Sequence, residues 1–497
     1  MKHKKHDFIK RESYILLLLF IFSLIPVLMI SRYIYAQSDD YSYGLYTHLA
    51  WNNTHNLLEV IKAAFKTVGV YMETWQGTYT SEFLMALQPG IFSEQMYHIV
   101  PMFIIICFFA GTYFFISSIT IRWLKMPFEY ALGLTSLISL ISIQNCRQQA
   151  QGFTWYNGAV HYTVIHALWI LVLGLNIRLL LAETKKKEAV LSVITSIFSF
   201  LVAGGNTLTV LAAVLMNLLI VGFLLINRLK YKKIMRLLIP TLLMIIGMVI
   251  NFTAKGNDIR LEVMGGKTYG VLPTIGRAFA AGAIYSIKWI DITLIIFLLW
   301  LLPFCIGISK RIMGKIVFGY PLLMLIASFC FFSSLWTPNL YTSNETDILR
   351  TQNFIYFVFI LLIFWNMIYI CGYIASKNIH VFDDKKTKFF APKARLLGCA
   401  LTILFTLLGS GYVVSQDISH YTSTSAFYAI RNGNAQKWAD TIEKNLEILQ
   451  DDNIKDVFVD RPEVIEEILS SNEIASWRYG LKDYYNKDSV LYKDETR

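Results

Sequence analysis

Charged residues are scarce in this chain of 497 residues, and its few cysteines follow no pairing pattern. Only 16% of the residues are Asp, Glu, Lys or Arg, while 55% are hydrophobic, which excludes an ordinary soluble globular protein. The six cysteines show no C-x-x-C spacing, and five of them lie in apolar stretches. The sequence therefore predicts neither a zinc site nor a disulfide framework.

Nucleotide-binding motifs are also missing. The chain has no G-x-G-x-x-G or Walker A pattern, and its inner connections are too short to form a domain that binds a nucleotide sugar. The middles of the apolar stretches hold almost no charged residues, and no internal repeat is visible. Both absences count against an ion-coupled transporter, which usually places ionisable groups near the bilayer midplane.

Long apolar stretches are abundant instead. About eleven of them approach the roughly 20 residues that one helical crossing of a bilayer requires. The first is too long for a cleaved signal peptide and is followed by no A-x-A-like site, so it is predicted to stay as an anchor. The stretches are residues 13–36, 96–119, 129–143, 159–182, 189–203, 207–226, 236–252, 284–308, 316–335, 354–375 and 396–414.

Positive charges are distributed unevenly between the connections. The connections assigned to the inner side hold 24 Lys and Arg residues, whereas the outer ones before residue 415 hold eight. This is the positive-inside pattern, so the net charge of +11 indicates topology and no nucleic-acid partner is predicted. We expect a multi-pass protein of a plasma membrane with a cytoplasmic N-terminus and an extracytoplasmic C-terminus.

Two domains are predicted from the change in composition near residue 415. Residues 1–415 should form an all-α polytopic membrane domain, and the polar residues 416–497 a small extracytoplasmic α/β domain. Within the second domain, residues 456–460 alternate as a strand, while 435–449 and 462–469 have helical patterns.

Two outer segments have helical patterns without being clear crossings. The first outer loop, residues 37–95, contains an amphipathic helix at 56–71 that is predicted to lie in the membrane interface. Residues 268–288 are apolar enough for an interfacial helix or for one half of a re-entrant pair. If they crossed the membrane, the basic connections after them would be outside, which the charge bias contradicts.

Five short polar motifs all fall on the predicted outer side. A protein that only had to sit in a bilayer would not collect carboxylates, arginines and aromatic residues at one face, so the motifs favour a membrane-embedded site. They are Ser38-Asp39-Asp40-Tyr41, Trp75-Gln76-Gly77-Thr78-Tyr79, Ala254-Lys255-Gly256-Asn257-Asp258-Ile259-Arg260, Thr337-Pro338-Asn339-Leu340-Tyr341 and Asp347-Ile348-Leu349-Arg350.

Asp39 and Asp40 follow the first crossing directly. A carboxylate at that depth costs several kcal/mol of desolvation unless it is hydrated, paired or lining a polar cavity. The pair could serve as a general base towards a hydroxyl or bind a divalent cation, and Asp40 is slightly favoured for its depth. The alternative is a solvated pair at the end of a helix. No other cofactor is indicated.

Arg260 and Arg350, with Lys255 in support, are among the few cations on the outer side. Arginine matches phosphate oxygens with two parallel hydrogen bonds, and a polar turn at Gly256 and Asn257 would let backbone N–H groups approach an anion. These residues are predicted to bind a lipid-linked phosphate. The alternative is that each arginine snorkels to the interface or pairs with a nearby aspartate.

Aromatic and amide residues of the same loops are candidates for binding sugar hydroxyls and rings. Glu82, which follows the tryptophan motif as Glu73 precedes it, is a further candidate, and the polar turn at 144–151 could contribute amides. The candidate acceptor-binding residues are Tyr41, Glu73, Trp75, Gln76, Tyr79, Trp155, Asn157 and Tyr341.

An aspartate pair after the first crossing, followed by a long outer loop with an interfacial helix, resembles the C-type (GT-C) superfamily of integral-membrane glycosyltransferases. The chain is also similar to an uncharacterised family of bacterial multi-pass proteins with S-D-D-Y, W-x-G-x-Y, A-P-G-N-x-x-R and T-P-x-x-Y motifs and a later arginine. The likeness covers most of residues 30–360. Lys255 replaces the proline of the third motif, which would make that turn looser.

The resemblance implies an inverting transfer of a sugar from a polyprenyl-phosphate donor to an extracytoplasmic glycan acceptor. Asp39 or Asp40 would be the base, and the arginines would hold the phosphate. The partners would be membrane lipid, donor, acceptor and other membrane proteins. Alternatives are a transporter or flippase of a lipid-linked saccharide, or a non-catalytic partner in envelope assembly. We expect the aspartates and the two arginines to converge within about 15 Å on one cavity.

Overall fold

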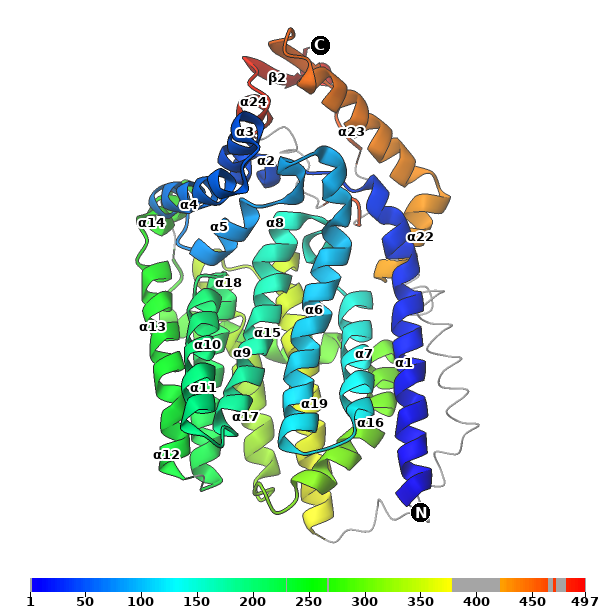
Figure 1. The fold of residues 1–497 in the computed structure, drawn as a ribbon, viewed down its shortest axis with the longest axis vertical. Coiled ribbons are helices and arrows are strands. Elements are labelled where there is room, and N and C mark those ends of the chain that lie inside the picture. Colours follow the sequence, from blue (N-terminus) through cyan, green and yellow to red (C-terminus); the bar gives the residue numbers. More distant parts are fainter. Residues whose placement is uncertain are drawn as a thin grey trace.

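A computed structural model describes residues 2–228, 230–265, 268–377, 421–463, 468–470 and 480–496. Long helices lie side by side in a bundle, and the two ends of the chain lie at opposite ends of it (Figure 1). The long helices are α1 (Lys2–Ile30), α6 (Val100–Ser117), α7 (Phe128–Gln144), α9 (Ile165–Leu180), α10 (Lys185–Ala203), α11 (Thr207–Ile226), α13 (Leu238–Phe252), α15 (Val271–Lys288), α16 (Ile292–Ile312), α17 (Pro321–Ser334) and α19 (Leu349–Ser376).

The protein is a predominantly helical multi-pass membrane protein. Within the described ranges, seven helical segments are long and apolar enough to cross a membrane, and α7 and α17 are shorter apolar helices. Ten of the eleven predicted stretches overlap a helix, while the stretch 396–414 lies outside the described residues. The seven segments are Phe8–Tyr33, Glu94–Trp123, Tyr156–Leu180, Thr207–Ile226, Tyr231–Phe252, Ile292–Ile312 and Leu349–Ser376.

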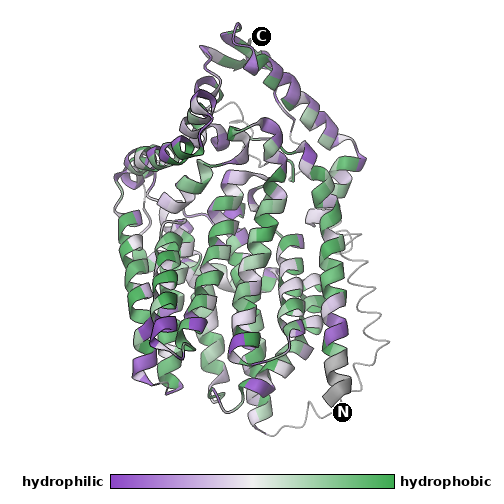
Figure 2. Cartoon of the chain, viewed as in Figure 1, coloured by the Kyte–Doolittle hydropathy of each residue, from purple (hydrophilic) through white to green (hydrophobic). Residues whose placement is uncertain are grey.

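The sides of the bundle are apolar, and its polar residues gather towards both ends (Figure 2). Large apolar side chains such as Phe22, Leu218, Ile239 and Leu322 are exposed on these sides. A soluble protein rarely exposes such a continuous apolar surface. Lipid can cover this apolar surface, because the backbone groups within a spanning helix are hydrogen-bonded to one another and need no water.

Helix α15 does not lead the chain to the opposite end of the bundle. Just before it, the Tyr269 amide donates to the Tyr341 carbonyl at 2.9 Å. Near its end, Tyr285 stacks on Trp336 and donates to Asp347 at 2.7 Å. Both ends of α15 therefore contact the short connection between α17 and α19, as expected for an interfacial or re-entrant helix.

Short helices cover one end of the bundle, which we call the capped end (Figure 1). Asn56 caps α4 by accepting from the Leu58 amide, so the helix predicted at 56–71 is confirmed, although its interfacial position stays a prediction. Its apolar face is open, and Phe65 is 64% exposed. The main helices of the capped end are α2 (Asp39–Tyr43), α3 (Leu45–Thr54), α4 (Leu57–Thr74), α5 (Tyr79–Met85), α8 (Tyr156–Ala159), α14 (Lys255–Val263) and α18 (Thr337–Thr342). Another short helix, α12 (Tyr231–Ile234), precedes α13 and is separated from it by one 3-10 turn.

The polar C-terminal residues form helices and one small sheet. The predicted strand at 456–460 and helix at 435–449 are confirmed. Of the helix predicted at 462–469, residues 462, 463, 468 and 469 are not helical, and 464–467 lie outside the described residues. The predicted domain boundary at 415 also lies outside them. Strands β1 and β2 pair in parallel with Asp456 opposite Ser489. The elements are α22 (Thr422–Arg431), α23 (Asn434–Gln450), β1 (Asp456–Val459), α24 (Leu481–Tyr484) and β2 (Ser489–Tyr492).

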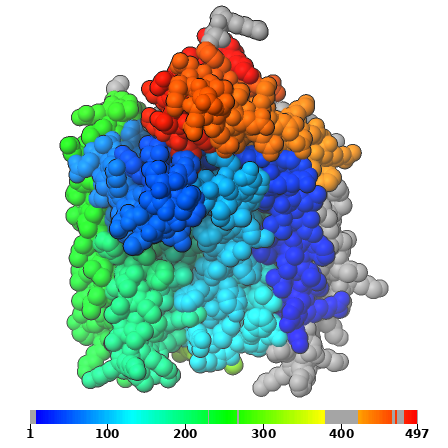
Figure 3. Space-filling model, turned by 45° about the horizontal axis from the view of Figure 1, so that its top comes forward, coloured from blue at the N-terminus to red at the C-terminus, as the bar shows by residue number. Residues whose placement is uncertain are grey.

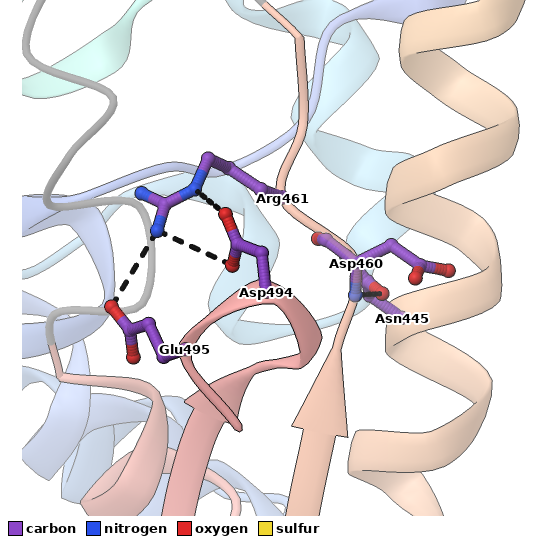
Figure 4. Close-up of polar contacts among 5 residues, drawn as sticks. All are labelled: Asn445, Asp460, Arg461, Asp494 and Glu495. Atoms are coloured by element: carbon purple, nitrogen blue, oxygen red, sulfur yellow. Dashed lines mark hydrogen bonds and ion pairs between the residues drawn. The ribbon is translucent and has the colours of Figure 1, made fainter. Parts of the chain in front are cut away.

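Polar contacts hold this C-terminal unit together (Figure 4). Asn445 of α23 exchanges two hydrogen bonds with the backbone of Asp460, at 2.7 and 2.8 Å. Arg461 donates to Asp494 at 2.9 Å and lies over the Tyr492 ring. The end of β1 is thereby tied to α23 and to the residues after β2, and the unit rests on residues of the 37–95 segment (Figure 3).

Candidate functional site

Two of the sequence motifs, residues 75–79 and 254–260, pack directly against each other at the capped end. The Gly77 amide donates to the Asn257 side chain at 3.1 Å. A Cβ atom on Gly77 would lie 2.0 Å from the Asn251 carbonyl oxygen, and one on Gly256 would lie 2.5 Å from the Trp75 amide nitrogen. Both positions need glycine because two backbones approach each other there.

The predicted turn at 256–257 is wrong, because α14 begins at Lys255. The backbone of residues 75 and 76 occupies the side of Gly256 on which a side chain would lie. The Asn257 amide donates to the Asn251 carbonyl at 2.7 Å, which commits this side chain to the backbone. Lys255 is exposed and lies 3.9 Å from Glu73, which is also exposed.

Arg260 is held in place by the tryptophan motif. Its Nη1 donates to Gln76 at 2.5 Å, and its guanidinium lies 5.4 Å from the centre of the Trp75 ring. Gln76 is buried and donates in turn to the Tyr43 hydroxyl at 3.1 Å. This chain of contacts links the arginine to α2, the helix that carries the aspartate pair.

The predicted base Asp39 and the predicted phosphate-binding arginines act electrostatically on shared neighbours. The charges of Asp39 and Arg260 both act on the Tyr43 hydroxyl. The charges of Arg260 and Arg350 both act on His161. The structure thus brings the motifs at 38–41, 254–260 and 347–350 within electrostatic range of shared neighbours.

Asp40 is fully buried and accepts three hydrogen bonds. The Tyr97 hydroxyl donates to it at 2.6 Å, the Gln37 amide at 3.0 Å and the Asn157 amide at 3.2 Å. Burial raises the pKa of Asp40 to about 7, although these hydrogen bonds favour the ionised form and lower it. Asp40 therefore joins the start of α2 to α8 and changes its charge near neutral pH.

Asp39 is the accessible member of the pair. It is partly exposed at the first position of α2, whereas Asp40 has no exposed surface. Ser38, just before it, has φ of +53°, a backbone conformation that is uncommon for a residue with a side chain and that clusters at functional sites. In the described part of the chain, no three His, Cys, Asp or Glu side chains are grouped to hold a metal ion.

Glu82 is a buried carboxyl whose environment the sequence did not reveal. It lies on α5 with no exposed surface, and the Thr78 hydroxyl donates to its Oε1 at 3.4 Å. Its Oε2 has no hydrogen-bond partner among the described residues. Burial raises its pKa to about 9, opposed by Thr78 and by the charge of Arg260. Glu82 therefore carries its proton at neutral pH and can donate a hydrogen bond.

Several candidate acceptor-binding residues support the backbone instead of facing an open space. Tyr79 donates to the Phe200 carbonyl at 2.7 Å, Trp155 to the Gln37 carbonyl at 3.2 Å and Tyr41 to the Ala36 carbonyl at 3.1 Å. The buried side chain of Asn157 differs, because both its amide atoms lack a partner within the described ranges. Tyr341 is exposed on α18.

A cleft of about 370 Å³ is lined by Ser42 of α2, the helix that begins with the aspartate pair. Its walls combine aromatic rings with hydroxyl and carboxyl groups, and they come from α2, α3, α4 and the C-terminal residues. Trp75 was predicted to bind acceptor, but the contribution of the C-terminal residues was not. The residues that define this aromatic cleft are Ser42, Tyr46, Tyr71, Trp75, Gly480 and Asp483.

Comparison with known proteins adds no relative. No protein-family model matches the chain, and no curated protein matches it in sequence.

Proposed function

We propose that this protein transfers a sugar from a polyprenyl-phosphate donor to an extracytoplasmic glycan of the cell envelope. The observation that carries the proposal is the linkage of Arg260 through Gln76 and Tyr43 to the helix of the aspartate pair. A phosphate-binding cation and a carboxylate are thereby held on one helical cap, at the end of a lipid-embedded bundle. The resemblance to C-type membrane glycosyltransferases agrees with this arrangement.

In the proposed reaction, the acceptor hydroxyl oxygen attacks the anomeric carbon while the bond from that carbon to the phosphate oxygen breaks. The hydroxyl proton passes to a carboxylate, and polyprenyl phosphate leaves. We assign proton acceptance to Asp39, because Asp40 has no exposed surface and accepts from three donors. Arg260 and Arg350 would stabilise the charge that develops on the leaving phosphate.

The aromatic cleft supports the choice of a glycan as acceptor. Rings such as Trp75 offer apolar faces to the C–H bonds of a sugar, while Asp483 and Ser42 can bond its hydroxyl groups. Ser42 also donates to the carbonyl of Asp39 at 3.1 Å. An acceptor in the cleft would therefore contact α2, the helix that begins with the proposed base.

The finer topology is also a proposal. We propose eleven crossings with a cytoplasmic N-terminus and with the capped end facing outwards, because the positive-inside bias favours it. α19 ends at the end of the bundle opposite to α22, which fits an odd number of crossings (Figure 1). Cysteines introduced at Asn53 and Lys437 should react with a reagent that cannot enter the cell, and one at Lys232 should not. Labelling of residue 437 only from the cytoplasmic side would overturn this topology.

Replacing Arg260 by alanine is expected to weaken donor binding by about tenfold to a hundredfold, because a hydrogen bond to a charged group contributes about 1.5–3 kcal/mol. The measurement is the Kd and KM for a short-chain polyprenyl-phosphate sugar. Arg277→Ala is the matched control, since Arg277 bonds Asn344, and neither residue belongs to one of the five motifs. Equal losses in both variants, or an unchanged donor Kd in Arg260→Ala, would remove the phosphate-binding assignment.

Replacing Tyr97 by phenylalanine is expected to move the acidic limb of the pH–rate profile to higher pH. The Tyr97 hydroxyl stabilises ionised Asp40 and so lowers its pKa. Without it, Asp40 takes up its proton at a higher pH, and the hydrogen bonds that hold α8 are disturbed sooner as the pH falls. The profile of kcat/KM between pH 5 and 9 checks this, and a limb that stays in place would show that Asp40 does not control it.

A further inference from the structure

The connection after α7 is fixed to α19 by one buried side chain. The Asn353 oxygen accepts from the amides of Arg147 and Gln148 at 2.8 and 2.9 Å, and its Nδ2 donates to the Gln148 carbonyl at 2.8 Å. Three hydrogen bonds from one amide set the backbone of both residues. Their side chains are therefore presented in a defined orientation.

Arg147 is a cation whose charge is incompletely matched by the protein. Its guanidinium lies 4.2 Å from the centre of the Tyr356 ring and 5.5 Å from that of Trp289. Its Nε and Nη2 atoms are buried and have no hydrogen-bond partner in the described part of the chain. No ion pair with a carboxylate is found for it there either.

The nearby carboxylate, Asp291, is already engaged. Both Asp291 and Arg147 act electrostatically on the Tyr356 hydroxyl, and the Arg147 guanidinium also donates a hydrogen bond to it. Asp291, however, accepts from the Leu294 amide at 2.7 Å as the cap of α16, and from the Asn145 side chain at 3.4 Å. It therefore balances part of the local charge without filling the donor positions of the guanidinium.

Gln148 adds a further donor next to the arginine. It is buried, and its Nε2 has no hydrogen-bond partner among the described residues. Two residues that are adjacent in the sequence thus carry buried N–H groups with no acceptor among the described residues. Burying such groups unsatisfied is costly, and burying an unpaired charge costs more.

We propose that Arg147 and Gln148 bind a phosphate group through side chains other than those of Arg260 and Arg350. A phosphate supplies several acceptor oxygens and a negative charge, and it matches the fork of a guanidinium. The Tyr356 and Trp289 rings beside the guanidinium are fully buried, so the phosphate would be held against the protein interior. This proposal does not depend on the sugar-transfer reaction.

The test is the melting temperature of the purified full chain in phosphatidylcholine nanodiscs, with three separate probes. The probes are inorganic phosphate, a short-chain prenyl phosphate and phosphatidic acid. A ligand that binds the folded state raises the melting temperature by an amount that grows with the logarithm of its concentration divided by its Kd. We expect a phosphate probe to stabilise the parental protein and its Kd to weaken at least tenfold in Arg147→Gln, while Arg277→Gln behaves as the parent.

The arms distinguish the source of the phosphate and the role of the arginine. A response to inorganic phosphate indicates a free anion, and a response only to the two lipids indicates a lipid headgroup. Should Arg147→Gln fail to fold, Gln148→Ala must still weaken binding of the same probe. Failure of all three probes to stabilise the parent, or equal responses in the parent and the folded variants, would show that Arg147 only packs on its aromatic neighbours.

Discussion

Asp39→Asn is expected to lower the rate of sugar transfer by about 10² to 10⁴-fold while leaving the melting temperature close to that of the parent. The amide keeps the size of the side chain but cannot accept the proton, and general-base catalysis typically contributes that factor. Asp39 is partly exposed, so the fold does not depend on its charge in the way that it depends on a buried group. Binding of the donor should be nearly unchanged.

Asp40→Asn is the matched variant, and it is expected to lower both the transfer rate and the melting temperature. One side-chain oxygen of Asp40 accepts from the Asn157 amide, and the other accepts from Tyr97 and Gln37. An asparagine would place an NH₂ group against one of these sets of donors, which leaves buried N–H groups unsatisfied.

Initial rates with a polyprenyl-phosphate sugar and melting curves of the same preparations separate the two roles. Asp39→Asn should lose rate without stability, and Asp40→Asn should lose both. If Asp39→Asn transferred sugar at the parental rate while correctly folded Asp40→Asn did not, Asp40 would be the base. If both variants transferred sugar at the parental rate, the two aspartates would be only a solvated pair at the end of a helix, and the proposed mechanism would be refuted.

The helices of this protein were largely predictable because their signals are local. Hydrophobic runs marked ten of the described helices of the bundle, and the apolar periodicity of 56–71 marked α4. Alternation marked the strand at 456–459. Positions of single residues within a motif were less accessible, since Asp39 and Asp40 are neighbours and only the fold decides that Asp40 turns inwards.

Contacts between distant segments could not be predicted. The motif at 254–260 reads as a flexible polar turn, yet its glycine is required by the backbone of Trp75 and its asparagine bonds Gly77. The C-terminal residues also reach the aspartate region. Gln37 donates to the Leu469 carbonyl at 3.3 Å, and a Cβ on Gly480 would meet the Ser42 amide at 2.9 Å. No local pattern reports such pairings.

The burial of Glu82 is a similar case. A glutamate after a tryptophan motif in an outer loop is usually solvated, and the sequence offered it only as a contact for hydroxyl groups. In the fold, α5 carries this side chain inwards, where it lies within range of the Arg260 charge and its pKa rises to about 9. Glu82 keeps its proton at neutral pH only in the folded protein, because the burial that raises its pKa arises when the segments of the capped end pack together.

The packing of residues 75–79 against 254–260 leads to the second large expected effect. Gly77→Ala should destabilise the protein by about 1–3 kcal/mol, as overpacking typically does, and should abolish most of the transfer activity. The added methyl group would lie 2.0 Å from the Asn251 carbonyl oxygen and 2.7 Å from the Ala254 Cβ. The two segments must separate, and the hydrogen bond from Arg260 to Gln76 would be lost with them.

Gly69→Ala is the control for this variant, because nothing lies within 4 Å of a Cβ at that exposed position of α4. Alanine is favoured over glycine inside a helix by about 0.5–1 kcal/mol, so this variant should melt at or above the parental temperature and keep its activity. Melting curves and initial rates of both variants give the comparison. A Gly77→Ala protein with parental stability and rate would mean that the two motifs do not need this close approach, and Arg260 would then lose its structural link to the aspartates.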